Sequence, residues 1–243
     1  MNQTANASDH HTSRIARPRW VATVIRHPSA ILLLVQLAGL LLYPFIEQTH
    51  SARALFGAFG VVVLLLTIAM VQRTRGRGWV SLAIAVPAVV LNVMGLTLEL
   101  PALRPWWAAL EALFYFYAAG CLIAYMLADR RATTDELFAA GATFTLLVWA
   151  FTYLFVLCQT LQPGCFSAAV DPQAPRTWTE LLFLSFALMS STGIGDVIPI
   201  TVHARAVASL EMFVGVMYLA LVVSRLIGLT IAPSAAGGKR GES

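Results

Sequence analysis

The sequence predicts an all-α integral membrane protein that has six transmembrane helices, with a shorter re-entrant helix and a loop between the fifth and the sixth. Hydrophobic residues make up 58% of the 243 residues, charged residues make up 12%, and the mean hydropathy is +0.75. These values lie outside the usual range of soluble domains. Six apolar stretches are long enough to cross a hydrocarbon core about 30 Å thick as helices, whereas a seventh, at residues 178–190, is too short.

The first 28 residues form a polar segment ahead of the first apolar stretch. They lack the apolar core and the small-residue cleavage site of a secretory signal, and they contain four arginines, Arg14, Arg17, Arg19 and Arg26. We therefore expect residues 1–28 to be a retained cytoplasmic arm. The net charge of +4 does not indicate a nucleic-acid partner, because the basic residues adjoin membrane spans, where they set the orientation.

Four of the apolar stretches, at residues 29–46, 52–72, 79–100 and 106–127, are expected to form a four-helix transmembrane domain over residues 29–131. The fourth contains no arginine. A voltage-sensing helix needs several, because each charge that crosses the field contributes about 2.3 kcal/mol per 100 mV, so steep voltage gating is not expected. Polar residues in or near these spans would connect helices by hydrogen bonds or line a separate site: Gln36, Asn92, Glu99 and Glu111.

The distribution of basic residues predicts the orientation. With both termini in the cytoplasm, only Arg53, Arg104, Arg176 and Arg205 lie outside. Twelve basic residues then lie inside: Arg14, Arg17, Arg19, Arg26, Arg73, Arg75, Arg77, Arg130, Arg131, Arg225, Lys239 and Arg240. The positive-inside rule therefore favours cytoplasmic termini in a multi-pass protein of the cell's inner (plasma) membrane, and it places residues 178–190 on the outer side.

Three cysteines are too few and too scattered for a disulfide framework or a metal site. Cys121 is expected to be a small apolar residue of the fourth span. Cys158 and Cys165 lie near the outer end of the fifth span, where an oxidising environment would allow a disulfide between them. Two free thiols are the alternative, and it is the one that we favour.

The second half of the chain contains two further span-length stretches, at residues 137–161 and 204–231, on either side of residues 178–190. Thr177 and Glu180 in the segment T-W-T-E form a capping-box pattern, in which the hydroxyl caps the first amides of a helix and the carboxylate bonds back to the cap. We expect a helix at 178–190 that enters the membrane from the outer side without crossing it. The segment S-S-T-G-I-G-D follows at residues 190–196.

Residues 137–229 resemble the pore domain of the tetrameric potassium channels, whose selectivity-filter signature is T-V-G-Y-G-D, and in particular bacterial six-span members without voltage-sensor arginines. Asp196, Pro199 and Thr201 match the D-x-x-P-x-T continuation of the bacterial members. The resemblance implies a pore domain over residues 132–231, with a pore helix at 178–190 and a filter at 191–196. It also implies a passive, potassium-conducting cation channel that assembles as a homotetramer in membrane lipid, with permeant K⁺ and no cofactor.

By this resemblance, K⁺ (or Na⁺, if the filter is less selective) is held by the backbone carbonyls of four residues: Ser191, Thr192, Gly193 and Ile194. The Ser191 hydroxyl would lie at the inner mouth of the filter. Gly193 and Gly195 are expected at positive φ, which would turn alternate carbonyls toward the axis. Asp196 would attract cations at the outer mouth.

The motif departs from the family signature at three positions. Ser191 replaces threonine, Thr192 replaces valine, and Ile194 replaces an aromatic residue. In the family the aromatic side chain packs against the pore helix and braces the filter, and isoleucine cannot form its hydroxyl hydrogen bond. A weakly selective K⁺/Na⁺ channel and a non-conducting auxiliary subunit are therefore alternatives to a potassium channel.

Three residues of the last span are further candidates. Gly215 matches a glycine in the inner helix of the family, so it is either a gating hinge or a packing site. Glu211 either pairs behind the filter or faces the cavity. Arg225, near the cytoplasmic end, either has a functional role in the span or simply extends to the membrane interface, and we favour the second. Residues 232–243 would form a cytoplasmic tail that is too short for a soluble regulatory domain.

Two other function classes have less support. An intramembrane hydrolase would use Ser190 or Ser191 with His203 as its base, but these serines belong to the glycine-containing motif, and His203 adjoins the start of the sixth span. A secondary transporter would have paired broken helices in two related halves, whereas this sequence has a single re-entrant segment. We therefore predict that the protein is not an enzyme.

Overall fold

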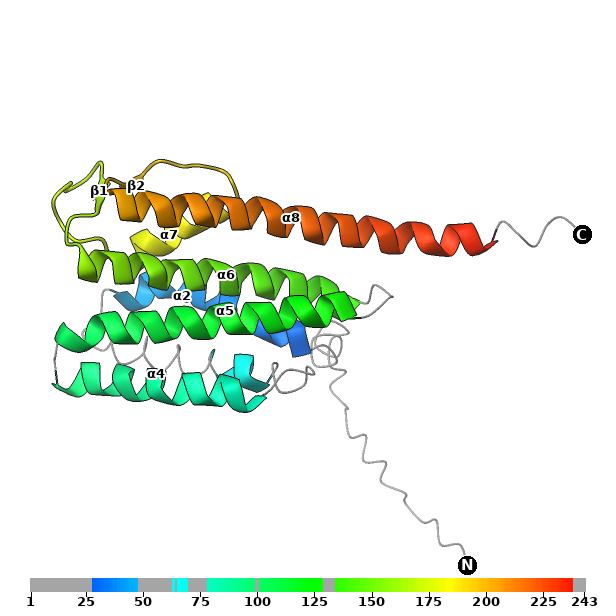
Figure 1. Ribbon diagram of the computed structural model, residues 1–243, viewed down its shortest axis with the longest axis horizontal. Helices are drawn as coiled ribbons and strands as arrows, with labels where there is room; N and C mark the ends of the chain where they lie inside the picture. The colour runs from blue at the N-terminus through cyan, green and yellow to red at the C-terminus, as the bar shows by residue number, and fades with distance from the viewer. Residues whose placement is uncertain are drawn as a thin grey trace, which may run out of the picture.

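The computed structural model describes residues 28–47, 63, 65–69, 78–98, 101–128 and 134–237, and these are mostly helical (Figure 1). The helices are α2 (Pro28–Glu47), α4 (Gly78–Leu98), the 3-10 helix η1 (Pro101–Leu103), α5 (Arg104–Ala128), α6 (Thr134–Leu161), α7 (Trp178–Met189) and α8 (Val202–Gly237). Two strands, β1 (Phe166–Ala168) and β2 (Val197–Pro199), form an antiparallel pair.

The predicted spans at 29–46, 79–100, 106–127, 137–161 and 204–231 coincide with α2, α4, α5, α6 and α8. The predicted arm at 1–28 and the predicted span at 52–72 lie largely outside the described residues. Among the described residues, three stretches are long and apolar enough to cross a membrane, namely Arg104–Ala128, Asp135–Leu161 and Val202–Arg225. The last helix continues to Gly237, past its predicted end at residue 231.

Helices α5 and α6 lie at the centre of the molecule, with α2 packed on α6 and α4 packed on α5 (Figure 1). The core cluster that they share is rich in small residues, among them Ala118 and Ala119 of α5 and Ala139 and Ala142 of α6, all fully buried. Small side chains let helices approach closely in lipid, where van der Waals packing rather than the hydrophobic effect drives helix association. The two helices therefore form the centre against which α2, α4, α7 and α8 pack.

The short helix α7 lies between α6 and α8 (Figure 1). Its leucines are buried on two sides, with Leu182 in the central core cluster and Leu181 in a second cluster beside the start of α8. The β1–β2 pair joins the segment after α6 to the segment after residues 190–196, in the register Phe166 to Pro199. Both ends of the loop that contains α7 are thereby anchored at one end of α6.

Helix α8 buries only a narrow stripe of its surface. The buried residues recur every three or four positions, which places them on one face: Ala204, Ala208, Glu211, Gly215 and Tyr218. The remaining surface exposes large apolar side chains, and Phe213, for example, is 63% exposed. An apolar surface of this extent needs lipid or further protein chains to cover it.

Candidate functional site

Helix α7 begins with the capping box that the T-W-T-E pattern predicts. The Thr177 hydroxyl accepts a hydrogen bond from the Glu180 backbone N–H at 3.3 Å, and the Thr177 N–H donates to Glu180 Oε2 at 2.6 Å. These two bonds satisfy amide donors that the first turn of a helix leaves unpaired. The residue at which the helix begins is therefore set by local sequence.

Arg176 orders the loop that precedes α7. Its buried guanidinium donates to three backbone carbonyls at 2.5–3.3 Å, those of Val170, Asp171 and Ala174. It also pairs with Glu180 Oε1 at 3.1 Å, and its backbone exchanges two 2.8 Å hydrogen bonds with the Gln159 amide of α6. From the sequence Arg176 is expected only to be a basic residue on the outer side, although its four-residue spacing to Glu180 is a signal for an ion pair.

The loop after α7 is fastened to the last turn of that helix. Ser190 N–H donates to Phe186 O at 3.0 Å, and the N–H groups of Thr192 and Gly193 both donate to Ala187 O, at 3.0 and 3.1 Å. Residues 191–196 are otherwise exposed in the protomer. The Thr192 hydroxyl also donates to Ala187 O, at 3.2 Å. The S-T-G-I-G-D segment is therefore attached to the end of a short helix and exposed on its other side.

The backbone of this loop differs from the expectation at one position. Gly193 has the predicted positive φ, at 66°, but Gly195 does not, and Ser191 has a φ of 59° instead. The expectation for Gly195 is wrong because the chain reverses at residues 191–193 and then leads directly into β2, whose pairing with β1 requires extended backbone. The Cβ of Ser191 makes its left-handed conformation costlier than that of a glycine.

The segment after the motif is tied to the end of α6. Thr201 Oγ1 donates to Gln162 Oε1 at 3.2 Å, and Gln162 Nε2 lies 3.0 Å from His203 Nδ1. Asp196 is exposed at the end of the motif, ahead of this anchored segment. The role of Asp196 at an outer mouth stays a prediction.

Neither serine of the hydrolase alternative is paired with His203. Ser190 Oγ donates to Phe186 O at 2.6 Å and lies 3.1 Å from Thr192 Oγ1, and the His203 ring contacts Gln162. A serine nucleophile needs a base within hydrogen-bond reach. The described residues do not form that arrangement at residues 190–203.

Gly215 is a close-contact residue on the buried stripe of α8. A Cβ added at this position would lie 2.3 Å from Met189 O and 3.0 Å from Met189 Cα. These are backbone atoms at the end of α7, so they cannot rotate away as a side chain would. The packing role that sequence analysis offered for Gly215 is therefore present in the structure, and the hinge role stays a prediction.

Glu211 lies on the same buried stripe of α8, where that stripe faces α7, and its side chain is fully buried. Its Oε1 is hydrogen-bonded to Ser185 Oγ of α7. Glu211 is therefore paired with a residue of α7, and its position relative to a selectivity filter stays a prediction. Ser185 was not singled out from the sequence, because a serine inside an apolar helix has no distinctive local pattern.

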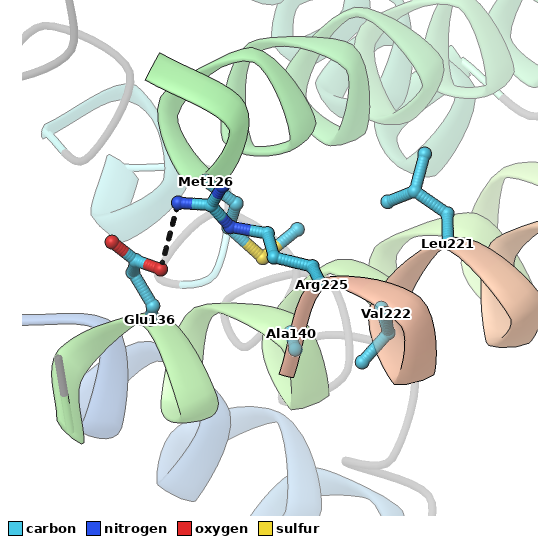
Figure 2. A pocket seen from close by; sticks show the side chains of 6 residues that line it. All are labelled: Met126, Glu136, Ala140, Leu221, Val222 and Arg225. Carbon is cyan, nitrogen blue, oxygen red and sulfur yellow. Dashed lines mark hydrogen bonds and ion pairs between the residues drawn. The ribbon is translucent and has the colours of Figure 1, made fainter. Parts of the chain in front are cut away.

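Arg225 forms an ion pair at the other end of α8. Its Nη2 lies 3.1 Å from Glu136 Oε2 in the first turn of α6, and the two side chains are 17% and 8% exposed. The pair lines a cavity of about 20 Å³ together with Met126, Ala140, Leu221 and Val222. Figure 2 shows these side chains. The sequence did not indicate this partner, because folding brings Glu136, 89 residues away in the chain, opposite Arg225.

Cys158 and Cys165 are free thiols in the structure. Burial raises the pKa of the Cys165 thiol to about 11, and the neighbouring Cys158 adds to the rise. Since the thiolate is the reactive form, we expect Cys165 in the folded protein to react with iodoacetamide at pH 8 about a hundredfold more slowly than in unfolded protein. The rate should increase as the pH approaches 11.

Mass spectrometry of digested samples, taken over a labelling time course, would measure this rate, with protein unfolded in detergent and urea as the control. Equal rates in the two samples would contradict the prediction. A Cys158–Cys165 peptide pair found before reduction would contradict the free-thiol state itself.

A protein-family model described as "Ion channel" matches residues 141–231. No curated protein and no solved structure matches the chain. The matched segment contains most of α6, all of α7, the 190–196 loop and most of α8. The match supports a passive ion channel, because the matched family consists of channels and not of enzymes. Together with the three long apolar helices, it indicates a membrane protein.

Proposed function

We propose that this chain is one subunit of a homotetrameric, potassium-conducting channel of the cell's inner membrane. The observation that supports this most is the arrangement inside the matched segment, where α7 ends between α6 and α8 and its last turn holds the exposed S-T-G-I-G-D loop. In this proposal residues 191–196 are the selectivity filter. The carbonyls of residues 191–194 replace the hydration shell of K⁺, which is the permeant ion and not a resident cofactor.

A ring of four copies is the proposed assembly, because each chain supplies a single loop and closed symmetry is the common solution for such subunits. Neighbouring copies would cover the exposed apolar faces of α8, and membrane lipid would surround the outer helices. The negative C-terminal ends of four α7 helices would then point toward the axis, and four Asp196 side chains would surround the outer mouth. Both features favour cations over anions.

The proposed membrane topology has six spans, with both termini in the cytoplasm. Residues 29–131 form the four-helix domain, residues 132–231 form the pore domain, and residues 1–28 and 232–243 lie on the cytoplasmic side. Three helices that are long and apolar enough to cross a membrane support the fourth, fifth and sixth of these spans. The distribution of basic residues supports the orientation.

A weakly selective K⁺/Na⁺ channel is the second candidate. The side chain of Ile194 is 54% exposed, and an aliphatic side chain forms no hydrogen bond that would brace the filter from behind. A filter that adjusts its width more easily would discriminate less between the two ions.

Purified protein in liposomes is expected to pass K⁺ down its gradient, with block by barium, and Gly193→Ala is expected to lose most of this flux. At a φ of 66° an alanine costs about 1–2 kcal/mol more than glycine, so the loop should leave its conformation. No atom lies within 4 Å of the added Cβ, so the effect would come from the backbone. Gly120→Ala in α5 is the matched control, because it also has open space around the Cβ and lies outside the pore domain.

The ion gradients separate the candidates. K⁺ flux well above Na⁺ flux supports the potassium channel, and equal fluxes support the weakly selective channel. An absence of flux from folded, reconstituted protein would contradict both and would favour a non-conducting or auxiliary subunit. Flux that Gly193→Ala leaves unchanged would contradict the location of the filter.

A further inference from the structure

The contact between Glu211 and Ser185 is part of a polar chain that crosses three helices. Glu211 on α8 and Ser185 on α7 are both fully buried. Ser185 Oγ is hydrogen-bonded to Glu211 Oε1 and also lies 2.8 Å from Val148 O on α6. One hydroxyl therefore links the carboxyl of α8 to the backbone of α6.

The number of hydrogens in this chain indicates the state of the carboxyl. A serine hydroxyl carries one hydrogen, and a carbonyl oxygen can only accept. If Ser185 donates to Val148 O, its own oxygen must accept from Glu211, which requires a protonated carboxyl. If an ionised Glu211 accepted the hydrogen of Ser185 instead, a carboxylate would lie in an apolar interior, with Oε2 buried and without a hydrogen-bond partner in the described part of the chain. Burial of such a charge is very unfavourable.

The charged groups on the neighbouring helices are engaged elsewhere. On α7, Glu180 pairs with Arg176 at the outer end. On α6, Glu136 pairs with Arg225, and Asp135 accepts from Ser29 Oγ at 2.9 Å, both at the inner end. On α8, Arg205 Nε donates to Pro199 O at 3.1 Å, and the titratable Tyr218 donates to Ala140 O at 2.6 Å. None of these interactions supplies a positive charge to Glu211.

This chain supports the part of α7 that holds the 190–196 loop. Ala187, whose carbonyl accepts the N–H groups of Thr192 and Gly193, lies two residues after Ser185. Gly215, one turn after Glu211 on the same stripe of α8, contacts the carbonyl of Met189. Glu211 and Gly215 thus meet α7 on both sides of the residue to which the loop is attached.

We propose that Glu211 is a positioning residue of the pore: as a protonated hydrogen-bond donor to Ser185, it holds α7 and the attached 191–196 loop in place, and loss of its proton releases them. The inference rests on the proposed conduction function and adds a proton-dependent support behind the filter. The support is present while Glu211 is protonated and is lost as the pH rises through its deprotonation.

Flux at a series of pH values, with liposomes of wild type and three variants, tests the proposal. Wild type should lose flux at alkaline pH. Glu211→Gln keeps a neutral donor of the same shape, so it should conduct at neutral pH and should not show this loss. Ser185→Ala and Glu211→Leu should lower flux about tenfold, the effect of one lost buried hydrogen bond. Thr145→Val is the control, because it removes a buried hydroxyl that bonds to Gly141 O within α6 and should conduct like wild type.

An infrared measurement keeps this test separate from the test of conduction. Wild type at neutral pH should show the carbonyl band of a protonated carboxylic acid that Glu211→Gln lacks, whether or not the protein conducts. Absence of that difference would overturn the proposal, as would a Glu211→Gln variant that is as impaired as Glu211→Leu or that retains the alkaline loss of flux. If no sample conducts while the band is present, the proposed function fails and the protonated state of Glu211 stands. Thermal unfolding of the same variants would then measure whether Glu211 stabilises the position of α7.

Discussion

Gly215→Ala is expected to destabilise the folded protein by about 1–3 kcal/mol and to remove most of its ion flux. The added Cβ would overlap Met189 O, at 2.3 Å, and crowd Met189 Cα, at 3.0 Å. Because these are backbone atoms, α8 and the end of α7 must separate, and Met189 directly precedes the 190–196 loop. Thermal unfolding of the purified protein in detergent, followed by the flux assay, measures both effects.

Gly120→Ala is again the matched control for Gly215→Ala, since it makes the same chemical change in a helix where no atom lies within 4 Å of the added Cβ. Its effect on stability should be neutral or favourable, because alanine favours a helix interior by about 1 kcal/mol over glycine. If Gly215→Ala unfolds like this control but alters gating, the hinge role is correct and the packing role is not the important one.

Arg225→Ala has the second large expected effect, a loss of up to about 3 kcal/mol of stability. The substitution leaves the Glu136 carboxylate, which is 8% exposed, without its 3.1 Å ion-pair partner. The last part of α8 should then separate from α6 and α5, where the pair lies beside the small cavity in Figure 2. Thermal unfolding of Arg225→Ala, Glu136→Gln and the double variant forms a cycle that isolates the pair.

In this cycle the double variant should be destabilised by less than the sum of the two single variants, because the interaction between Arg225 and Glu136 can be lost only once. Arg205→Ala is the control, since Arg205 is exposed at the N-terminal end of α8 and its side chain donates to the Pro199 carbonyl. An effect of Arg225→Ala no larger than that of Arg205→Ala would show that Arg225 simply extends to the interface, as its position in the sequence suggests.

Local patterns were sufficient for several features of the structure. The T-W-T-E segment led to the start of α7, because a capping box needs only residues three positions apart. The apolar stretches led to α2, α4, α5, α6 and α8, because the length and composition of a helix that crosses lipid are constrained by the bilayer. The S-T-G-I-G-D motif led to the loop that α7 presents, and its spacing from α7 needed no knowledge of the rest of the chain.

Contacts between distant residues required the folded chain. Glu211 and Ser185 are 26 residues apart, Ser185 and Val148 are 37 apart, and Arg225 and Glu136 are 89 apart. A single polar residue in an apolar helix looks the same in the sequence whether it faces lipid, a cavity or another helix. The packing of α8 on α6 and α7 decides which face is covered, and so it decides that Glu211 supports α7, that Gly215 has no room for a side chain, and that Arg225 has a partner.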